Sequence, residues 1–567
     1  MNINLGIIDL IAHPTAGFLL PSHSTLRHDT SDSQASQFGD LSPPESPRWR
    51  IDCSGGLGSH YLVYPLFMTR VPPLRIDVFI PTSDNLSSDI CESLDLGLAF
   101  HTRDPERLKH LRIHNYLLQA LQAWTDRLPN PSEWYDSQIF GTRIILDDLP
   151  KDPATAPIKV APMHFLEASF HSVASLRDLW GPEVLLPDTV DFRDIHVKQQ
   201  IQDSISIVEV GGVVYAMKAV TNFIKFMYHE LHILLTLSKH PHPNIISRPV
   251  KLVTKRSPFG GTHGVVGFLI EYHSAGSIRD VLPKRRIDKT LKLEDQIRWA
   301  QQLTSAVSHI FSSRFGLYYP DLRCENILLS QDDNIIMVDF EQRGVWCEFS
   351  APEVNAIEYI RILAKSDKID EQVRQRCVER LSRLLPGWDS LIMAQQYHEP
   401  VEGYNVPWLA LNKAEREYAG VYMLGRVLWC FFEGVPAPDK AIIWQSYAQE
   451  SHISFPEYRL TPQPIRDLID RCTRGRTEQL NSLVVQKGSK LVAEGYDESN
   501  LSPQEHQEVI KKLSRQFWRD QVEKAEMWLD TREKEIEAGS WSNNYYDRPT
   551  LSEVERELDM FARSSKH

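Results

Sequence analysis

Three features are scarce in this sequence of 567 residues, and each scarcity argues against a class of protein. The seven cysteines, at positions 53, 91, 324, 347, 377, 430 and 472, are odd in number, scattered and never arranged as CxxC. This pattern disfavours a disulfide framework or a zinc site. No apolar run approaches the ~18 residues of a membrane span. Basic residues do not dominate, because the formal net charge is -13. We therefore expect a cytoplasmic or nuclear protein that binds neither nucleic acid nor membrane.

Composition and turn signals divide the chain into three parts. Residues 1–49 are predicted to form an N-terminal segment and a flexible linker, because 22–48 is rich in Ser, Asp, Gln and Pro and poor in large apolar residues. Residues 50–185 are predicted to form an α+β module of unknown function. Its expected strands are HYLVYPLFMTR (60–70), LRIDVFIPT (74–82), GTRIILDDLP (141–150) and APMHFLEASF (161–170), and its expected helix covers 104–126.

From residue 186 onward, strands come first and helices follow. SISIVEV (204–210) and VVYAMKAV (213–220) flank Gly211-Gly212, which predicts a hairpin. An amphipathic helix is predicted over 222–240, and IISRPVKLVTKR (245–256) with GVVGFLIEYH (264–273) predicts a second hairpin. After Gly276 the pattern is helical, apart from a short hairpin of NILLS (326–330) and IIMVDF (335–340). A long helix is predicted over 502–538, opened by a capping box of Ser502 and Glu505.

Several short motifs occur in one order along this region. YPDLRCEN (319–326) and VDFE (338–341) follow FLIEYHSAGSIRDVL (268–282), while VVYAMK (213–218) and HPHPNII (240–246) precede it. VYMLGRVLWCFFEGVPAP (421–438) and YYDRPTLSEV (545–554) come later. Together these segments resemble the eukaryotic protein kinase family. The resemblance covers about 190–475 and resumes at 545–562. The chain is also similar to kinase-like proteins that are common in filamentous fungi.

The resemblance implies an α+β fold of the bilobal protein kinase-like type. A small β-rich lobe is expected at about 186–273 and a large helical lobe at about 274–567. The large lobe is expected to carry insertions at about 354–419 and 475–544. The α+β module at 50–185 would be an addition to this fold.

The resemblance further implies ATP and Mg²⁺ as cofactors, and phosphoryl transfer that depends on positioning and charge neutralisation. Asp321 would orient a substrate hydroxyl and accept its proton, and Arg323 would keep positive charge near the transferred phosphate. Asn326 and Asp339 would hold Mg²⁺, which prefers oxygen ligands.

The remaining residues implied by the resemblance bind the nucleotide. Lys218 would contact the α and β phosphates and form an ion pair with Glu230. These two residues are closer in sequence than is usual in the family. The backbone of Glu271 and His273 would meet the adenine edge.

The chain departs from the family pattern at four places. The expected glycine loop, near 198–207, reads VKQQIQDSIS and has no glycine. Glycines let backbone N–H groups approach phosphates. Pro320 replaces an Arg that would pair with a phosphorylated activation loop, and Glu341 replaces a Gly. We expect Glu341 to hold the metal-binding triplet in one conformation. Gly420 stands where an Asp usually braces the catalytic loop.

The activation segment has two alternative readings. SAPEV (350–354) ends a very short segment, or GYNVPWLALNKAERE (403–417) is the equivalent region after a long helical segment. Arg548 distinguishes them, because it should pair with Glu353 in the first case and with Glu415 or Glu417 in the second.

Three functions are compatible with these residues. The first is an ATP/Mg²⁺-dependent serine/threonine kinase acting on an unknown protein substrate. The second is a pseudokinase, a scaffold for an unknown partner that binds nucleotide weakly or not at all, as the missing glycines and the changes at 320, 341 and 420 suggest. The third is a small-molecule kinase, because the peptide-docking region is atypical.

Overall fold

The computed structural model describes residues 41–565, except for 56–58, 69–73, 81–89, 91–92, 96–109, 257–260, 262, 313–315, 401, 439–446, 448–450, 452, 478–479, 481–482, 488–489 and 497–500. Most of the predicted N-terminal segment and linker, up to residue 40, lies outside the described residues, as does the start of the helix predicted over 104–126.

The first part of the described chain is a five-stranded sheet with two helices. The strands follow chain order, β1–β2–β3–β4–β5, and all neighbours are antiparallel except β3 and β4. The bounds are β1 Trp49–Gly55, β2 His60–Pro65, β3 Ile76–Phe79, α5 Arg112–Asp126, α6 Pro131–Asp136, β4 Thr142–Leu146 and β5 Ile158–Ala161. The apolar side of α5, including Tyr116 and Leu121, packs on this sheet and closes a separate core.

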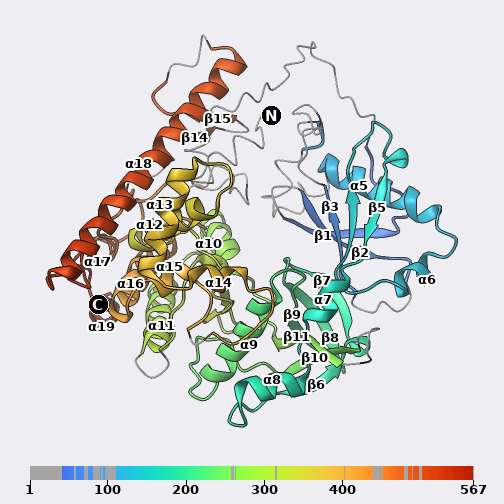
Figure 1. The fold of residues 1–567 in the computed structure, drawn as a ribbon, viewed down its shortest axis with the longest axis horizontal. Helices are drawn as coiled ribbons and strands as arrows, with labels where there is room; N and C mark the ends of the chain where they lie inside the picture. Colours follow the sequence, from blue (N-terminus) through green and yellow to red (C-terminus); the bar gives the residue numbers. More distant parts are fainter. Residues whose placement is uncertain are drawn as a thin grey trace.

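A second sheet of six strands follows in the chain. Its order is β6–β10–β11–β9–β8–β7, with β6 parallel to β10 and the other neighbours antiparallel. The bounds are α7 His164–Ser169, α8 Val173–Trp180, β6 Asp188–Asp191, β7 His196–Gln200, β8 Ile205–Val210, β9 Val213–Lys218, α9 Ile224–Leu237, β10 Lys251–Arg256 and β11 His263–Glu271. In Figure 1 the strands of this sheet lie below those of the five-stranded sheet.

The rest of the described chain is mostly helical. The bounds are α10 Ile278–Ile287, α11 Leu293–Phe311, β12 Ile327–Leu329, β13 Ile335–Met337, α12 Pro352–Lys365, α13 Glu371–Leu384, α14 Trp388–Met393, α15 Val406–Leu409, α16 Lys413–Glu433, α17 Gln463–Cys472, β14 Val484–Lys487, β15 Lys490–Ala493, α18 Pro503–Glu537 and α19 Leu551–Ser564. Helix α16 is buried on all sides from Ala419 to Glu433, while α18 runs along the outer edge of the molecule (Figure 1).

Local signals in the sequence agree with much of this architecture. Gly211 and Gly212 both have positive φ, 58° and 80°, in the turn that joins β8 to β9. The capping box of Ser502 and Glu505 opens α18. The strand predicted over 161–170 is wrong, however. Only Ala161 belongs to a strand, and 164–169 forms α7, because Leu166 packs into the large core rather than onto a sheet neighbour.

The packing of the hydrophobic core places one segment in a different part of the molecule from the part that composition predicted. Residues 163–184 were assigned by sequence to the N-terminal module, yet Leu166, Leu176 and Trp180 pack into the large core together with α9. The predicted domain boundaries themselves stay a prediction. The mixed α/β arrangement of sheets and helices is compatible with a protein kinase-like fold. Among the described helices, none is long and apolar enough to span a membrane.

Candidate functional site

Lys218 is the last residue of β9, and it sits at the centre of a buried polar cluster. Its strand pairs with β11, where Gly267 approaches the Lys218 backbone closely. A Cβ at position 267 would lie 2.4 Å from the Lys218 carbonyl oxygen, so this position admits only glycine without a backbone shift. The Lys218 side chain is 2% exposed. Strand pairing thus fixes the lysine backbone, and burial confines its ammonium.

Three carboxylates surround the Lys218 ammonium. Its Nζ lies 2.8 Å from Asp339 Oδ1, 2.8 Å from Glu341 Oε1 and 3.2 Å from Glu230 Oε2. Burial alone would lower the pKa of Lys218, but the carboxylates, Asp339 foremost, hold that pKa well above its ordinary value. Burial raises the pKa of Glu230 to about 7 even though Lys218 opposes this shift. Three acidic side chains therefore share one ammonium, and the Glu230 carboxyl takes up a proton near neutral pH.

The backbone around Asp339 connects this cluster to helix α9. Asp339 has φ +64°, a left-handed conformation that Asp tolerates better than most residues. The next residue, Phe340, donates its backbone N–H to Glu230 Oε1 at 2.9 Å. Burial by itself would raise the pKa of Asp339, but Lys218 outweighs it and keeps the pKa below its ordinary value. Glu230 therefore binds both the lysine and the segment that carries Asp339.

A second polar group, Asp321, Arg323 and Asn326, lies in the loop before β12. Asn326 Nδ2 donates to Asp321 Oδ2 at 2.9 Å, and Arg323 Nε lies 2.9 Å from Asp321 Oδ1. Arg323 also pairs with Glu325 at 2.6 Å and stacks its guanidinium 4.5 Å from the centre of the Trp346 ring. Burial raises the pKa of Asp321 to about 6, with Arg323 opposing and Asp339 reinforcing the shift.

The two groups are neighbours, joined through the backbone. The Val338 N–H, directly before Asp339, donates to the Asn326 carbonyl at 3.0 Å. Lys218, Glu230, Asp321, Arg323, Asn326 and Asp339, all predicted from the sequence, are thus gathered in one region of the molecule.

Glu271 and His273 lie at and just beyond the end of β11, the strand that pairs with β9. Their side chains line a pocket of about 290 Å³ bounded by residues 237–248, His309 and Ile336, and none of the six clustered residues lines it. Their predicted backbone contact with adenine stays a prediction.

Sequence reasoning missed how helix α9 is held against the site. His229, next to Glu230, forms a 2.9 Å hydrogen bond with Gln342 Oε1. Lys225 donates to the carbonyls of Leu391 and Ile392, at 2.8 and 3.3 Å, at the C-terminal end of α14. These partners are more than 100 residues apart in the chain, so no local pattern indicates them.

Glu341 was recognised only as a replacement for glycine. No local signal identifies its role, because Asp339 has a left-handed backbone and the segment is not a regular strand. Its contact with Lys218 ties the segment to β9, in agreement with the expectation that Glu341 restrains the triplet.

The space beside Gly420 is occupied by Phe311. A Cβ at Gly420 would lie 2.8 Å from the Phe311 ring, so the aspartate expected by resemblance would not fit there. The loop before Asp321 is held by other residues: Gln342 Nε2 donates to the Tyr318 carbonyl at 2.7 Å, and the Tyr318 hydroxyl donates to the Glu402 carbonyl at 3.1 Å.

Arg548 distinguishes the two readings of the activation segment. It forms a buried bidentate pair with Glu353, at 2.5 and 3.0 Å. Glu415 pairs instead with Arg532, at 2.8 Å through both nitrogens. The structure therefore contains the pair expected if SAPEV ends a short segment and residues 354–419 form an insertion.

The clustered residues provide what chemistry on phosphates requires. Oxygen atoms of Glu230, Asp339 and Glu341 lie within 4.8 Å of one another and surround the Lys218 ammonium, while Asp339 and Asn326 offer the oxygen ligands that a hard divalent cation prefers. Asp321, whose pKa is about 6, is mostly ionised at neutral pH and is suited to accept a proton. Arg323 and Lys218 supply positive charge on either side of Asp339.

Parts of the chain are similar to known protein kinases. No protein-family model matches the chain. It is 32% identical over 121 residues to the fatty acyl-CoA synthetase and RNA processing-associated kinase 1 of Saccharomyces cerevisiae, covering 21% of this chain and 12% of that protein. It is 28% identical over 162 residues to the RAC family serine/threonine-protein kinase homolog of Dictyostelium discoideum, covering 25% and 33%. It is 34% identical over 99 residues to CBL-interacting serine/threonine-protein kinase 19 of Arabidopsis thaliana, covering 18% of each.

These matches support a protein kinase-like family for the chain. The chain spans a third or less of the length of these curated relatives. The narrower similarity to fungal kinase-like proteins stays a prediction.

Proposed function

We propose that this protein is an ATP/Mg²⁺-dependent phosphotransferase with a bilobal kinase fold, which transfers the γ-phosphate of ATP to a Ser or Thr hydroxyl of a protein. The observation that carries this proposal is the Lys218–Glu230–Asp339 cluster beside the Asp321–Asn326 pair. Residues 121 positions apart in the chain meet here, and burying several charges together is costly for a purely structural purpose.

The residues present fit the implied cofactors. Asp339 and Asn326 would hold Mg²⁺, which would neutralise the negative charge of the phosphates. Asn326 donates its Nδ2 to Asp321, which leaves its side-chain oxygen for a cation. Lys218 would bind phosphate oxygens, Asp321 would take the proton of the acceptor hydroxyl, and Arg323 would hold Asp321 in place.

A second candidate function is a pseudokinase, a scaffold that binds nucleotide weakly or not at all. The specific observation that favours it is the Glu341 carboxylate, 2.8 Å from the Lys218 ammonium. This ion pair competes with the phosphates that would bind to Lys218. A cytoplasmic or nuclear location accompanies both proposals, on the basis of the scattered cysteines.

Transfer of labelled phosphate from Mg·ATP by the purified full-length chain, to itself and to generic protein substrates, tests the proposal. Asp321→Asn and Asp339→Asn should each abolish transfer, whereas Asp332→Asn, an exposed carboxylate in the β12–β13 turn, should leave it intact. Transfer that persists in both site variants would refute the kinase. Absent transfer, with Mg·ATP stabilising the wild type but not Asp339→Asn, would favour the nucleotide-binding scaffold.

A further inference from the structure

The N-terminal module packs on the outer face of the six-stranded sheet through residues beside its strands, Leu74 and Phe140. Side chains alternate along β9, so Met217 and Ala219 point away from the face on which Lys218 lies. On that outer face they pack in a separate apolar cluster with Val208 of β8 and with Phe140, which precedes β4. The N-terminal module therefore contacts the strand that carries Lys218 from its other side.

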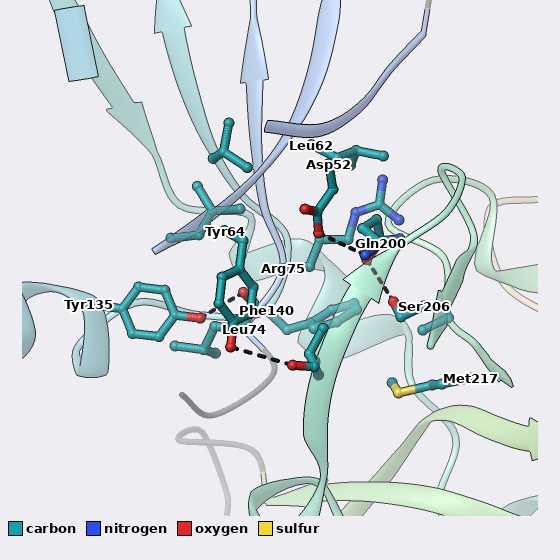
Figure 2. A pocket seen from close by; sticks show the side chains of 14 residues that line it. Asp52, Leu62, Tyr64, Leu74, Arg75, Tyr135, Phe140, Gln200, Ser206 and Met217 are labelled. Carbon is teal, nitrogen blue, oxygen red and sulfur yellow. Dashed lines mark hydrogen bonds between the residues drawn. The ribbon is translucent and has the colours of Figure 1, made fainter. Parts of the chain in front are cut away.

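Polar side chains of the N-terminal sheet bind the backbone of β7. Asp52 accepts the Gln200 N–H at 2.8 Å, and Arg50 donates to the Lys198 carbonyl at 3.0 Å. The Tyr64 hydroxyl donates to the Val197 carbonyl at 3.4 Å. Figure 2 shows Asp52, Tyr64 and Gln200 around the pocket at this seam. Among the described residues β7 is the edge strand of its sheet, so these side chains bind backbone groups that are not paired with a further strand.

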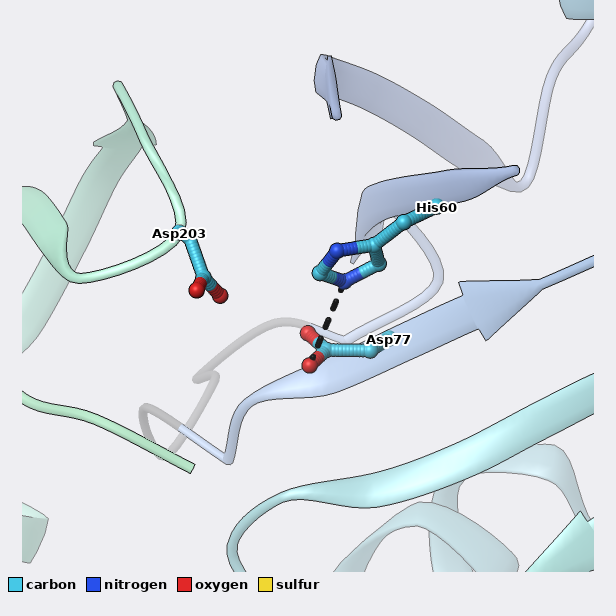
Figure 3. Close-up of side chains that lie close together, drawn as sticks. All are labelled: His60, Asp77 and Asp203. Carbon is cyan, nitrogen blue, oxygen red and sulfur yellow. Dashed lines mark ion pairs between the residues drawn. The ribbon is translucent and has the colours of Figure 1, made fainter. Parts of the chain in front are cut away.

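An ion pair extends this contact to the turn that follows β7. The guanidinium of Arg75 is bonded both to Asp77 in β3 and to Asp203 in the turn. Arg75 is 5% exposed, whereas Asp203 is 51% exposed. Figure 3 shows Asp203 facing His60 and Asp77 across the seam. Because Arg75 bonds to both aspartates, this group is an ion-pair network that needs no metal ion.

The turn itself, residues 201–204, contains no glycine and is held by hydrogen bonds from the residues that flank it. Ser206 Oγ donates to Gln200 Oε1 at 2.6 Å, and Gln200 Nε2 donates to the Gln202 carbonyl at 2.6 Å. The Ala219 N–H, next to Lys218, donates to the Ser204 carbonyl at 2.9 Å. The turn therefore joins β8 beside the end of β9 that carries Lys218.

We propose that the N-terminal module is a positioning element for nucleotide binding: through Asp52 and Arg75 it fixes the 201–204 turn in one conformation, in place of a flexible glycine loop. The ligand is the phosphate chain of a nucleoside triphosphate, so the inference rests on the proposed function. The turn follows Gln200 and precedes Ile205, which pairs with Lys218. Backbone groups that are ordered before binding do not have to lose conformational entropy when phosphates arrive.

Asp203→Asn in the full chain tests this inference without removing a buried charge. Asp203 is half-exposed, so the variant should fold, while Arg75 loses its partner in the turn but keeps Asp77. Amide hydrogen exchange of peptides covering 198–207 should accelerate, and the Kd for Mg·ATP should rise about 3- to 10-fold. Asp203→Glu, which keeps the carboxylate, should behave more like the wild type. Asp52→Ala should act in the same direction as Asp203→Asn.

Glu209→Gln is the matched control. It breaks an ion pair on the same hairpin, between Glu209 and the Lys198 ammonium at 2.8 Å, in which no side chain of the N-terminal module takes part. Hydrogen exchange that is unchanged in Asp203→Asn, or that Glu209→Gln accelerates equally, would overturn the positioning role. If the wild type binds Mg·ATP, a Kd that is the same in Asp203→Asn as in the wild type would overturn it as well. If the wild type binds no Mg·ATP, the proposed function and the nucleotide role both fail, while the exchange measurement still decides whether the module fixes the turn.

Discussion

Glu341 and Asp339 each place a carboxylate oxygen 2.8 Å from the ammonium of Lys218. A single lysine therefore serves two acids from the same segment, with Glu230 as a third at 3.2 Å. The relationship matters because ATP brings about four negative charges, and Glu341 adds a carboxylate where the resemblance expects a glycine. Glu341 is thus the residue that decides whether Lys218 is accessible to phosphates.

Glu341→Gln should strengthen ATP binding. The substitution keeps the shape of the side chain, removes one negative charge beside the phosphates and weakens the hold on Lys218. We expect the Kd for ATP, measured by calorimetry without Mg²⁺, to fall about 3- to 10-fold. Asp332→Asn, which removes an exposed carboxylate, should leave the Kd unchanged. A Kd that rises or stays constant in Glu341→Gln would contradict this account of the cluster.

The sequence predicts only those site residues that local patterns or the family resemblance identify. Asp321, Asn326 and Asp339 were identified from their register, and the turn at Gly211-Gly212 from its residue types. The contact of Glu341 depends on the left-handed backbone of Asp339, which no local signal indicated. The partners of the N-terminal sheet on β7 are about 130 to 150 residues away in the chain, a separation over which periodicity carries no information.

Lys218→Met should destabilise the fold as well as the site. Removing the ammonium leaves the buried carboxylates of Glu230 and Glu341 and the partly exposed Asp339 without their cation, a loss expected to lower the free energy of unfolding by about 3–5 kcal/mol. Urea unfolding at pH 7.5 measures it. Adding Glu341→Gln to Lys218→Met should recover part of the loss, because one uncompensated charge disappears. If Lys218→Met alone were as stable as the wild type, the carboxylates would have to be protonated or solvated in that variant. This expected loss is the reason to probe nucleotide binding with Asp339→Asn.

The Arg548–Glu353 pair should stabilise the helical region strongly. Both side chains are buried, Arg548 at 1% and Glu353 at 7% exposure, and the pair joins the start of α12 to the segment before α19. Breaking it with Glu353→Gln should lower the free energy of unfolding by about 3–5 kcal/mol. A double-mutant cycle with Arg548→Met should give a coupling energy above about 1 kcal/mol. The same cycle on the exposed pair Arg374–Glu371 should give no measurable coupling, and equal results for the two pairs would count against this role.

The pH dependence of phosphate transfer should be set by Asp321. Burial raises its pKa to about 6, so the carboxylate is protonated below that pH and ionised above it. A protonated Asp321 cannot accept the proton of the acceptor hydroxyl, so the rate should be constant above pH 7 and should fall about tenfold per pH unit well below 6. Transfer rates at saturating Mg·ATP between pH 5 and 8.5 measure the profile. Glu325→Gln removes a carboxylate that pairs with Arg323 and whose negative charge raises the pKa of Asp321, so it should move the midpoint to lower pH. A profile without a midpoint in this range, or one that Glu325→Gln moves upward, would show that another group limits the reaction.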